Sequence, residues 1–218
     1  MNYFITGTDT GVGKTLIACA LLHGYATQGQ RVIGMKPVAA GWDEDDLNPD
    51  VKQLCAASNI AAPVGQINPY SFSLPLAPHI AAHHAGIHID LAHVIAAYHE
   101  LAVQADVVIV EGVGGFKVPL NEHEDSADLA VQLGLPVILV VGVRLGCLNH
   151  ALLTLAAIQA SGLRCAGWVA NVLESAMPVV AENIAALKQR INAPLLGIVP
   201  YQVVPDIQRT ALQFISLP

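Results

Sequence analysis

Short apolar segments rich in β-branched residues alternate with helical patterns along the 218 residues of the chain. Such alternation predicts an α/β fold, a mostly parallel sheet with helices on both faces, because parallel strands are joined by crossover helices. Strands are expected at 3–6, 31–36, 107–110, 137–142, 165–171 and 195–199. Helices are expected near 14–28, 48–58, 89–104, 125–134, 148–161 and 178–191.

Nothing in the pattern divides the chain. The longest irregular stretch, 59–78, is expected to be a loop that is functional or lies across a surface. No internal repeat and no low-complexity linker interrupts the alternation. We therefore predict a single domain over residues 1–218.

The composition excludes several classes of protein. Hydrophobic residues make up 54% of the chain and the mean hydropathy is +0.52. The longest apolar runs, such as 136–143, are nevertheless far shorter than the ~20 residues of a membrane-spanning helix. The net charge of −7 and the lack of a basic stripe argue against a nucleic-acid partner. With no export signal and no C-x-x-C pair among four cysteines, we expect a cytoplasmic protein.

Residues 4–18, FITGTDTGVGKTLIA, combine a strand, a glycine-rich turn and the start of a helix. The ending GKT matches the phosphate-binding pattern G-x-x-x-x-G-K-[ST], but the first glycine is Gly7, and Thr8 occupies its usual position. Lys14 is expected to neutralise the phosphates and the Thr15 hydroxyl to bind Mg²⁺. The alternative is a glycine-rich turn that only packs tightly.

Two acidic residues are candidates for the metal. Glu111 follows the buried strand 107–110 and precedes a glycine-rich turn, the position of a Walker-B acid. The alternative for Glu111 is a solvated residue at the end of an edge strand. Asp50 is a second candidate, although by position alone it reads as a helix-start acid.

Lys36 ends the second expected strand, and Pro37 keeps the chain extended after it. Lys36 is predicted to lie at the same rim as the phosphate loop, and its alternative is a solvated lysine at a strand end.

Six of the nine histidines lie between His79 and His99, and His79 and His83 are four residues apart. They lack an H-E-x-x-H pattern and a cysteine or acid at ligand spacing. We therefore interpret them as surface and loop histidines rather than as a metal site.

Seven segments resemble, in order, those of dethiobiotin synthetases: GTDTGVGKT (7–15), KPVAAG (36–41), NPYSF (68–72), PHIAA (78–82), VEGVGG (110–115), LPVILVVGVRLGCLNHALLT (135–154) and GWVAN (167–171). The resemblance covers nearly the whole chain, includes the early glycine and implies a P-loop NTPase-like fold. Asp9 stands where the related partitioning ATPases and nitrogenase iron proteins have a signature lysine.

The resemblance implies a dethiobiotin synthase, an ATP-dependent cyclo-ligase of biotin biosynthesis. In that family, 7,8-diaminononanoate takes up CO₂ (or bicarbonate) as a carbamate, which ATP phosphorylates. The second amine then displaces phosphate and closes the ureido ring of dethiobiotin. Mg²⁺ is the implied cofactor, ATP the co-substrate and a homodimer the implied assembly.

The resemblance also implies roles for individual residues. Lys14 and Lys36 would be catalytic, and Thr15, Asp50 and Glu111 would hold Mg²⁺. The nucleotide would contact Gly11, Val12, Gly13, Lys14, Thr15, Leu16, Asp50, Glu111, Gly112, Val113, Gly114, Asn171, Pro200, Tyr201, Gln202 and Asp206. The diamine would contact Lys36, Ala40, Gly146, Leu148 and Asn149. The last three lie at the start of a helix that, in this family, comes from the neighbouring subunit and binds the carboxylate of the diamine.

One position departs from the family pattern K-P-V-x-S-G, because Ala40 stands at the usual serine. The missing hydroxyl removes one hydrogen bond, worth ~0.5–1.5 kcal/mol, and leaves room for a relaxed substrate preference.

Two other functions remain as alternatives. Corrinoid amidotransferases of the same superfamily carry an additional glutaminase domain, for which 218 residues leave no room. A nucleotide-dependent switch would need neither Lys36 nor the carboxylate-binding helix.

Overall fold

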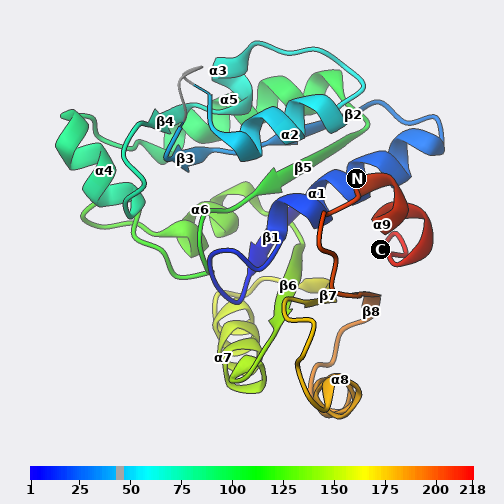
Figure 1. Cartoon of the computed structure of the whole chain (residues 1–218). Coiled ribbons are helices and arrows are strands. Elements are labelled where there is room, and N and C mark those ends of the chain that lie inside the picture. Colours follow the sequence, from blue (N-terminus) through cyan, green and yellow to red (C-terminus); the bar gives the residue numbers. More distant parts are fainter. Residues whose placement is uncertain (43–46) are drawn as a thin grey trace.

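Six parallel strands form the central sheet of this protein. The computed structural model describes residues 1–42 and 47–218, and its strand order is β2-β5-β1-β6-β7-β8 (Figure 1). The strands are β1 (Tyr3–Gly7), β2 (Val32–Met35), β5 (Val107–Glu111), β6 (Val137–Val143), β7 (Cys165–Val172) and β8 (Leu195–Val199). The predicted α/β class and the six predicted strands are confirmed, with ends that differ by at most one residue.

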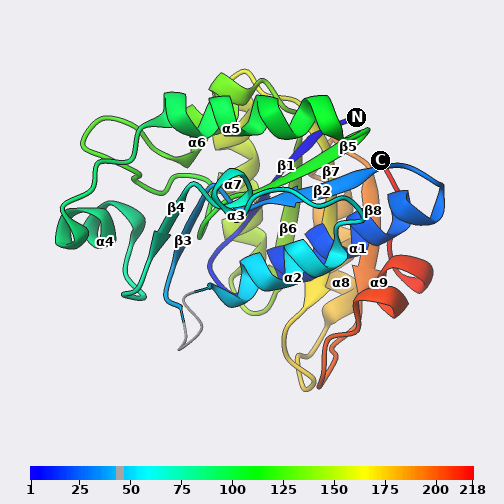
Figure 2. The same ribbon diagram turned by 90° about the horizontal axis from the view of Figure 1, so that it is seen from above.

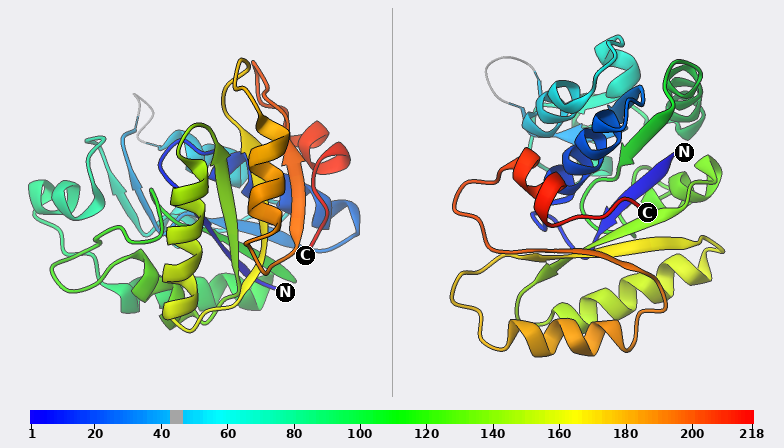
Figure 3. Two further views of the ribbon diagram at one scale, coloured as in Figure 1. Left: turned by 90° about the horizontal axis from the view of Figure 1, so that it is seen from below. Right: turned by 90° about the vertical axis from the view of Figure 1, so that its right-hand side faces the viewer.

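Helices cover both faces of this sheet (Figures 2 and 3). One face carries α1 (Lys14–Thr27), α2 (Pro49–Ala57) and α9 (Ile207–Gln213). The opposite face carries α5 (Leu91–Gln104), α6 (Ser126–Leu133), α7 (Cys147–Ala160) and α8 (Val180–Lys188). In the right-hand view of Figure 3, α9 and α7 lie on opposite sides of the sheet.

Both faces of each central strand are buried, which explains why the strands read as continuous apolar runs. In β6, Ile138 and Val140 pack in the cluster that contains α1, whereas Leu139 and Val141 pack in the cluster that contains α7. Alternate residues therefore join two separate cores through one sheet.

The prediction of a loop at 59–78 is wrong in part. This stretch contains α3 (Val64–Ile67), β4 (Tyr70–Phe72) and the first residue of α4 (Pro78–Ala85). β4 pairs in parallel with β3 (Val38–Ala40) in a separate two-stranded sheet. Elements of three or four residues are too short to show a hydrophobic period, so the sequence pattern did not indicate them.

The helix expected at 178–191 is shorter than predicted. Pro178 lies in a turn, and α8 extends only from Val180 to Lys188. Ile191, the last residue of the expected helix, is still buried against the core beyond the end of α8.

None of the helices in the described parts of the chain has the length and apolar character needed to cross a membrane. The four cysteines are all free thiols.

The packing of α1 against the sheet predicts a large loss of stability for Leu22→Ala. Leu22 is fully buried, so we expect its truncation to lower the free energy of unfolding by about 2–5 kcal/mol in urea titrations. Leu212→Ala, at an exposed position of α9, is the matched control and should cost less than about 0.5 kcal/mol. Equal losses in the two variants would contradict the burial of α1.

Candidate active site

The carboxyl edge of the six-stranded sheet brings most of the predicted site residues together. The phosphate loop follows β1, Lys36 follows β2 and Glu111 ends β5. A cavity of about 800 Å³ opens at this edge. Its lining includes predicted site residues from five segments: Gly11, Gly13, Lys14, Thr15, Leu16, Lys36, Ala40, Asp50, Glu111, Val113 and Gly114.

The displaced glycine of the phosphate loop has a steric cause. A Cβ atom on Gly7 would lie 2.5 Å from Cγ2 of Val12, closer than side chains approach. Thr8, at the usual glycine position, donates its N–H to the carbonyl of Val140 (3.0 Å), and its hydroxyl accepts the N–H of Gly142 (3.2 Å). The loop therefore passes close to Val12 at Gly7, where no side chain fits, while the side chain of Thr8 bonds the loop to β6.

The end of the loop leads directly into α1. Gly13 has a φ of +91°, the left-handed region that glycine adopts without strain. The Asn171 amide donates to the carbonyl of Val12 (2.9 Å), and Lys14 Nζ donates to the carbonyl of Asp9 (3.0 Å). Within the described chain no side chain caps the start of α1, so its backbone N–H groups suit an anion.

The register of the sheet joins Lys36 to Glu111. Met35 of β2 is aligned with Val110 of β5, so the residues that follow them, Lys36 and Glu111, lie beside each other. Lys36 Nζ lies 2.6 Å from Glu111 Oε1 and 2.9 Å from Asp50 Oδ2. The Thr15 hydroxyl donates to the same Glu111 oxygen (2.9 Å). The structure thus brings Lys36, which the sequence placed at the rim of the phosphate loop, together with Thr15, Asp50 and Glu111, for which the family resemblance implied a shared role.

Burial and these contacts shift the pKa values of Lys14, Lys36 and Asp50. Burial, followed by repulsion from Lys36, lowers the pKa of Lys14 to about 8. Burial also acts to lower the pKa of Lys36, but the Glu111 and Asp50 carboxylates outweigh it and raise that pKa above its ordinary value. Burial acts to raise the pKa of Asp50, but Lys36 and a hydrogen bond from Thr15 lower it. Lys36 and Asp50 therefore remain charged at neutral pH, whereas Lys14 titrates close to it.

Oxygen atoms around Lys36 fit a hard divalent cation. Glu111 Oε2 is buried and has no hydrogen-bond partner among the described residues. The Thr15 hydroxyl contacts the same carboxylate, and Asp50 approaches it through Lys36. Carboxylate and hydroxyl oxygens are the ligand types that Mg²⁺ takes in phosphate sites, so this donor set fits the ion.

Several predicted residues lie outside the lining of this cavity. At the start of α7, Gly146 and Asn149 are exposed and Leu148 is half-buried. Residues 200–202 and Asp206 also lie outside it, as do Val12, Gly112 and Asn171. Asp206 instead caps α9 by accepting the N–H of Arg209 (2.9 Å), and the amide of Gln202 donates to Thr210 Oγ1 (3.1 Å).

Sequence reasoning missed residues that shape the cavity. The side chain of Asn48 accepts the N–H of Asp50 (2.9 Å) and donates to the carbonyl of Gly41 (2.5 Å). It therefore joins Asp50, a candidate metal ligand, to the segment after β3. The signal was present, since asparagine followed by proline is typical of a helix start. Residues 75–78, within the stretch that was expected to be a functional or surface loop, also line the cavity, as does Pro205, which no motif marks.

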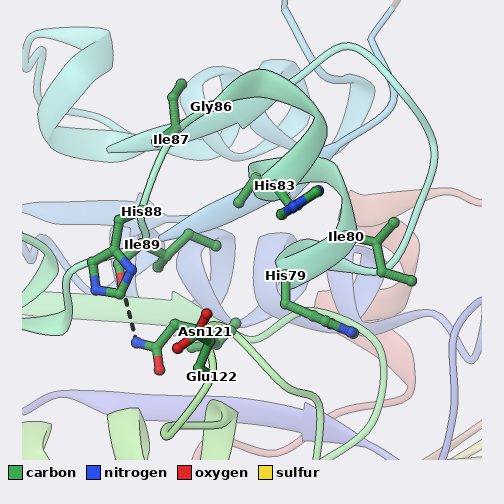
Figure 4. Close-up of a pocket in the computed structure, with 11 residues that line it drawn as sticks. His79, Ile80, His83, Gly86, Ile87, His88, Ile89, Asn121 and Glu122 are labelled. Atoms are coloured by element: carbon green, nitrogen blue, oxygen red, sulfur yellow. Dashed lines mark hydrogen bonds between the residues drawn. The ribbon is translucent and has the colours of Figure 1, made fainter.

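The histidine-rich segment borders a second cavity of about 570 Å³ (Figure 4). His79 and His83 lie on α4, and His88 lies on the segment that follows it. Among the described residues that line this cavity there is no lysine or arginine, so it lacks the cations that a triphosphate needs. Within residues 1–42 and 47–218, no three His, Cys, Asp or Glu side chains are placed to hold a metal ion.

Comparisons with known proteins agree with this geometry. A family model described as an AAA domain matches residues 1–207. The chain is 59% identical to the ATP-dependent dethiobiotin synthetase BioD of Nitrosospira multiformis over 92% of this chain and 88% of that protein. It is 55% identical to the same enzyme of Aromatoleum aromaticum, over 96% and 94% of the two chains. Among solved structures it resembles the MinC:MinD cell division complex of Aquifex aeolicus, with a TM-score of 0.57 and 15% identity over 93% of this chain and 82% of that one.

The fold and the phosphate loop together define a P-loop nucleoside-triphosphate-binding protein of the α/β class. Within that class, the chain belongs to the family of ATP-dependent dethiobiotin synthetases. The family prediction from the sequence motifs is confirmed.

The low pKa of Lys14 predicts that ATP affinity falls as the pH rises through about 8. The free protein loses the Lys14 charge in this range, and binding the triphosphate then requires proton uptake. Titration calorimetry at pH 7 and pH 9 measures the difference. Lys14→Met, which cannot titrate there, should bind ATP more weakly and should lose most of this pH dependence. An affinity that stays constant in the native chain would show that Lys14 remains charged throughout.

Proposed function

We propose that this protein forms dethiobiotin from 7,8-diaminononanoate, CO₂ and ATP, with release of ADP and phosphate. The observation that carries the proposal is the position of Lys36, which is buried between Glu111 and Asp50 at the mouth of the phosphate loop. A simple nucleotide-binding switch has no need of a second buried lysine there. The family relationship supplies the substrates.

In the proposed mechanism, one amine of the substrate attacks CO₂ and loses a proton to solvent, which gives a carbamate. A carbamate oxygen then attacks the γ-phosphorus of ATP, the bond to ADP breaks, and a carbamoyl phosphate forms. The second amine attacks the carbamoyl carbon and expels phosphate, which can accept the proton that the amine releases. Two anions meet in the first transfer, so Lys14 and Lys36 lower its barrier by opposing their charge.

Thr15, Asp50 and Glu111 would hold Mg²⁺, which neutralises the triphosphate when it is bound. Lys36 already contacts both carboxylates, so the same lysine holds these two acids close together. The segment 75–78 and Ala40, which also line the cavity, would pack against the aliphatic part of the diamine.

The amide of Asn171 supports a preference for adenine. Its nitrogen donates to the carbonyl of Val12 (2.9 Å), which leaves its oxygen as an acceptor. An acceptor suits the exocyclic amino group of adenine and opposes the carbonyl that guanine has at the same place. Pro200, Tyr201, Gln202 and Asp206, which follow β8, would lie on the adenine side of the site.

We also propose that the protein acts as a homodimer in the cytoplasm. Leu145, just before α7, is 95% exposed, and Leu153 on the same helix is also exposed. An apolar surface around α7 suits contact with a second copy, so that Gly146, Leu148 and Asn149 reach the carboxylate of a diamine bound by the neighbouring subunit.

The test is phosphate release with Mg²⁺-ATP and bicarbonate, with and without 7,8-diaminononanoate, followed by mass analysis of the product. Release that depends on the diamine, with a product heavier by one CO₂ minus one water, supports the proposal. Release that ignores the diamine, or nucleotide-dependent binding of a protein partner, would favour the switch alternative.

Lys36→Ala is expected to lower the turnover number by about 100-fold or more, because the carbamate and the triphosphate lose the charge between them. The variant also leaves Glu111 and Asp50 without their cation, so its folding is checked by circular dichroism at the assay temperature. Lys117→Ala, which removes an exposed lysine, is the control and should keep the native rate. Near-native turnover in Lys36→Ala would refute this assignment.

Ala40→Ser restores the hydroxyl that the family usually has. Ala40 lines the cavity, so we expect the KM for the diamine to fall by roughly 2- to 10-fold or to stay unchanged. The change is measured by diamine titration at saturating ATP, with the exposed Ala61→Ser as control. A clear loss of activity would mean that the segment after β3 is built differently from that of its relatives.

A further inference from the structure

An ion pair outside the carboxylate cluster joins the phosphate loop to the segment before α7. Arg144 Nη2 pairs with Asp9 Oδ2, and the other oxygen of Asp9 accepts the N–H of Thr10 (2.7 Å). The carbonyl of Arg144 accepts the N–H of Cys147, the first residue of α7 (3.0 Å). One residue therefore holds the phosphate loop by its side chain and the helix start by its backbone.

Asp9 is also in contact with the lysine that a bound nucleotide engages. The carbonyl of Asp9 accepts Lys14 Nζ (3.0 Å), and a triphosphate in the loop competes for the same ammonium. The contacts of Thr8 with Val140 and Gly142 reach a buried strand, whereas the contact of Asp9 reaches the turn before α7. A continuous series of bonds thus runs from Lys14 through Asp9 and Arg144 to Cys147.

We propose that Asp9 and Arg144 are positioning residues that couple the nucleotide in the phosphate loop to the start of α7, so that each substrate tightens the binding of the other. The inference rests on the proposed function, which places the carboxylate of the diamine at the start of α7. In a dimer whose α7 serves the neighbouring subunit, the coupling runs from the nucleotide site of one protomer to the diamine site of its partner.

The chain contains a matched ion pair that separates coupling from stability. The side chains of Asp9 and Arg144 are 47% and 36% exposed, and those of Arg31 and Asp106 are 59% and 44% exposed. Solvent screens both pairs, so each contributes little to folding. Arg31 and Asp106 precede β2 and β5, at the amino edge of the sheet and opposite the site.

The experiment measures the affinity of a non-hydrolysable ATP analogue with and without saturating diamine. The ratio of the two affinities is the coupling factor, which we expect to be at least fivefold in the native chain. Arg144→Gln and Asp9→Asn both break the pair, and in both the factor should fall below twofold. Arg144→Lys keeps a cation that pairs with Asp9 and should restore part of it, while Arg31→Gln should leave it unchanged.

The two variants also differ in a way that separates coupling from simple charge balance. Arg144→Gln leaves a bare carboxylate beside the loop and should weaken binding of the analogue alone, whereas Asp9→Asn leaves a free cation and should not. If Arg144→Gln and Asp9→Asn change the affinity for the analogue in opposite directions but both keep the native coupling factor, the pair acts only through charge and the proposal is overturned. A native factor near one, or the same loss in Arg31→Gln, would also overturn it.

Failure of the inference can be told apart from failure of the proposed function. Diamine-dependent phosphate release by the native chain, with no coupling between the sites, would refute only the role of Asp9 and Arg144. Analogue binding without any diamine-dependent release would refute the proposed function and the inference with it.

Discussion

The contact between Lys36 and Glu111 is the constraint on which the site depends. It arises because β2 and β5 are neighbours in a register that aligns Met35 with Val110, so that one residue further a cation and an anion meet in a buried place. Burying an isolated charge destabilises the fold, and the attraction between Lys36 and Glu111 offsets this desolvation penalty for both side chains. Asp50 and Thr15 complete the arrangement from two helices, so the sheet and the helices of one face are tied together at the functional edge.

The phosphate loop shows how the same function tolerates a different order of residues. What the loop needs is one position without a side chain, where the chain passes Val12, and one anchor to β6. Gly7 and Thr8 meet these needs, with the glycine one position earlier than in the common pattern. A motif is therefore better judged by the contacts that its residues make than by the position of its first glycine.

The sequence predicted those elements and residues whose role is local. The six strands follow from buried apolar runs, and Lys14 and Thr15 follow from the spacing of the loop. The role of Asp50 stayed ambiguous because its contact with Lys36 joins α2 to the end of β2. The pairing of Asp9 with Arg144 spans 135 residues and leaves no trace in a local pattern. The small β3–β4 sheet was missed because its strands are too short to show a period.

The strand order has a consequence for how the chain acquires its site during synthesis. β5 lies between β1 and β2, so the first two strands can take their final places only after the chain has been made beyond Glu111. Until then, Lys36 lacks its main counter-charge, and β1 has no partner on the side that β5 later occupies. Contacts between distant parts of a chain form late and slowly. A nascent chain that already contains the whole phosphate loop would therefore not yet be a competent nucleotide-binding protein.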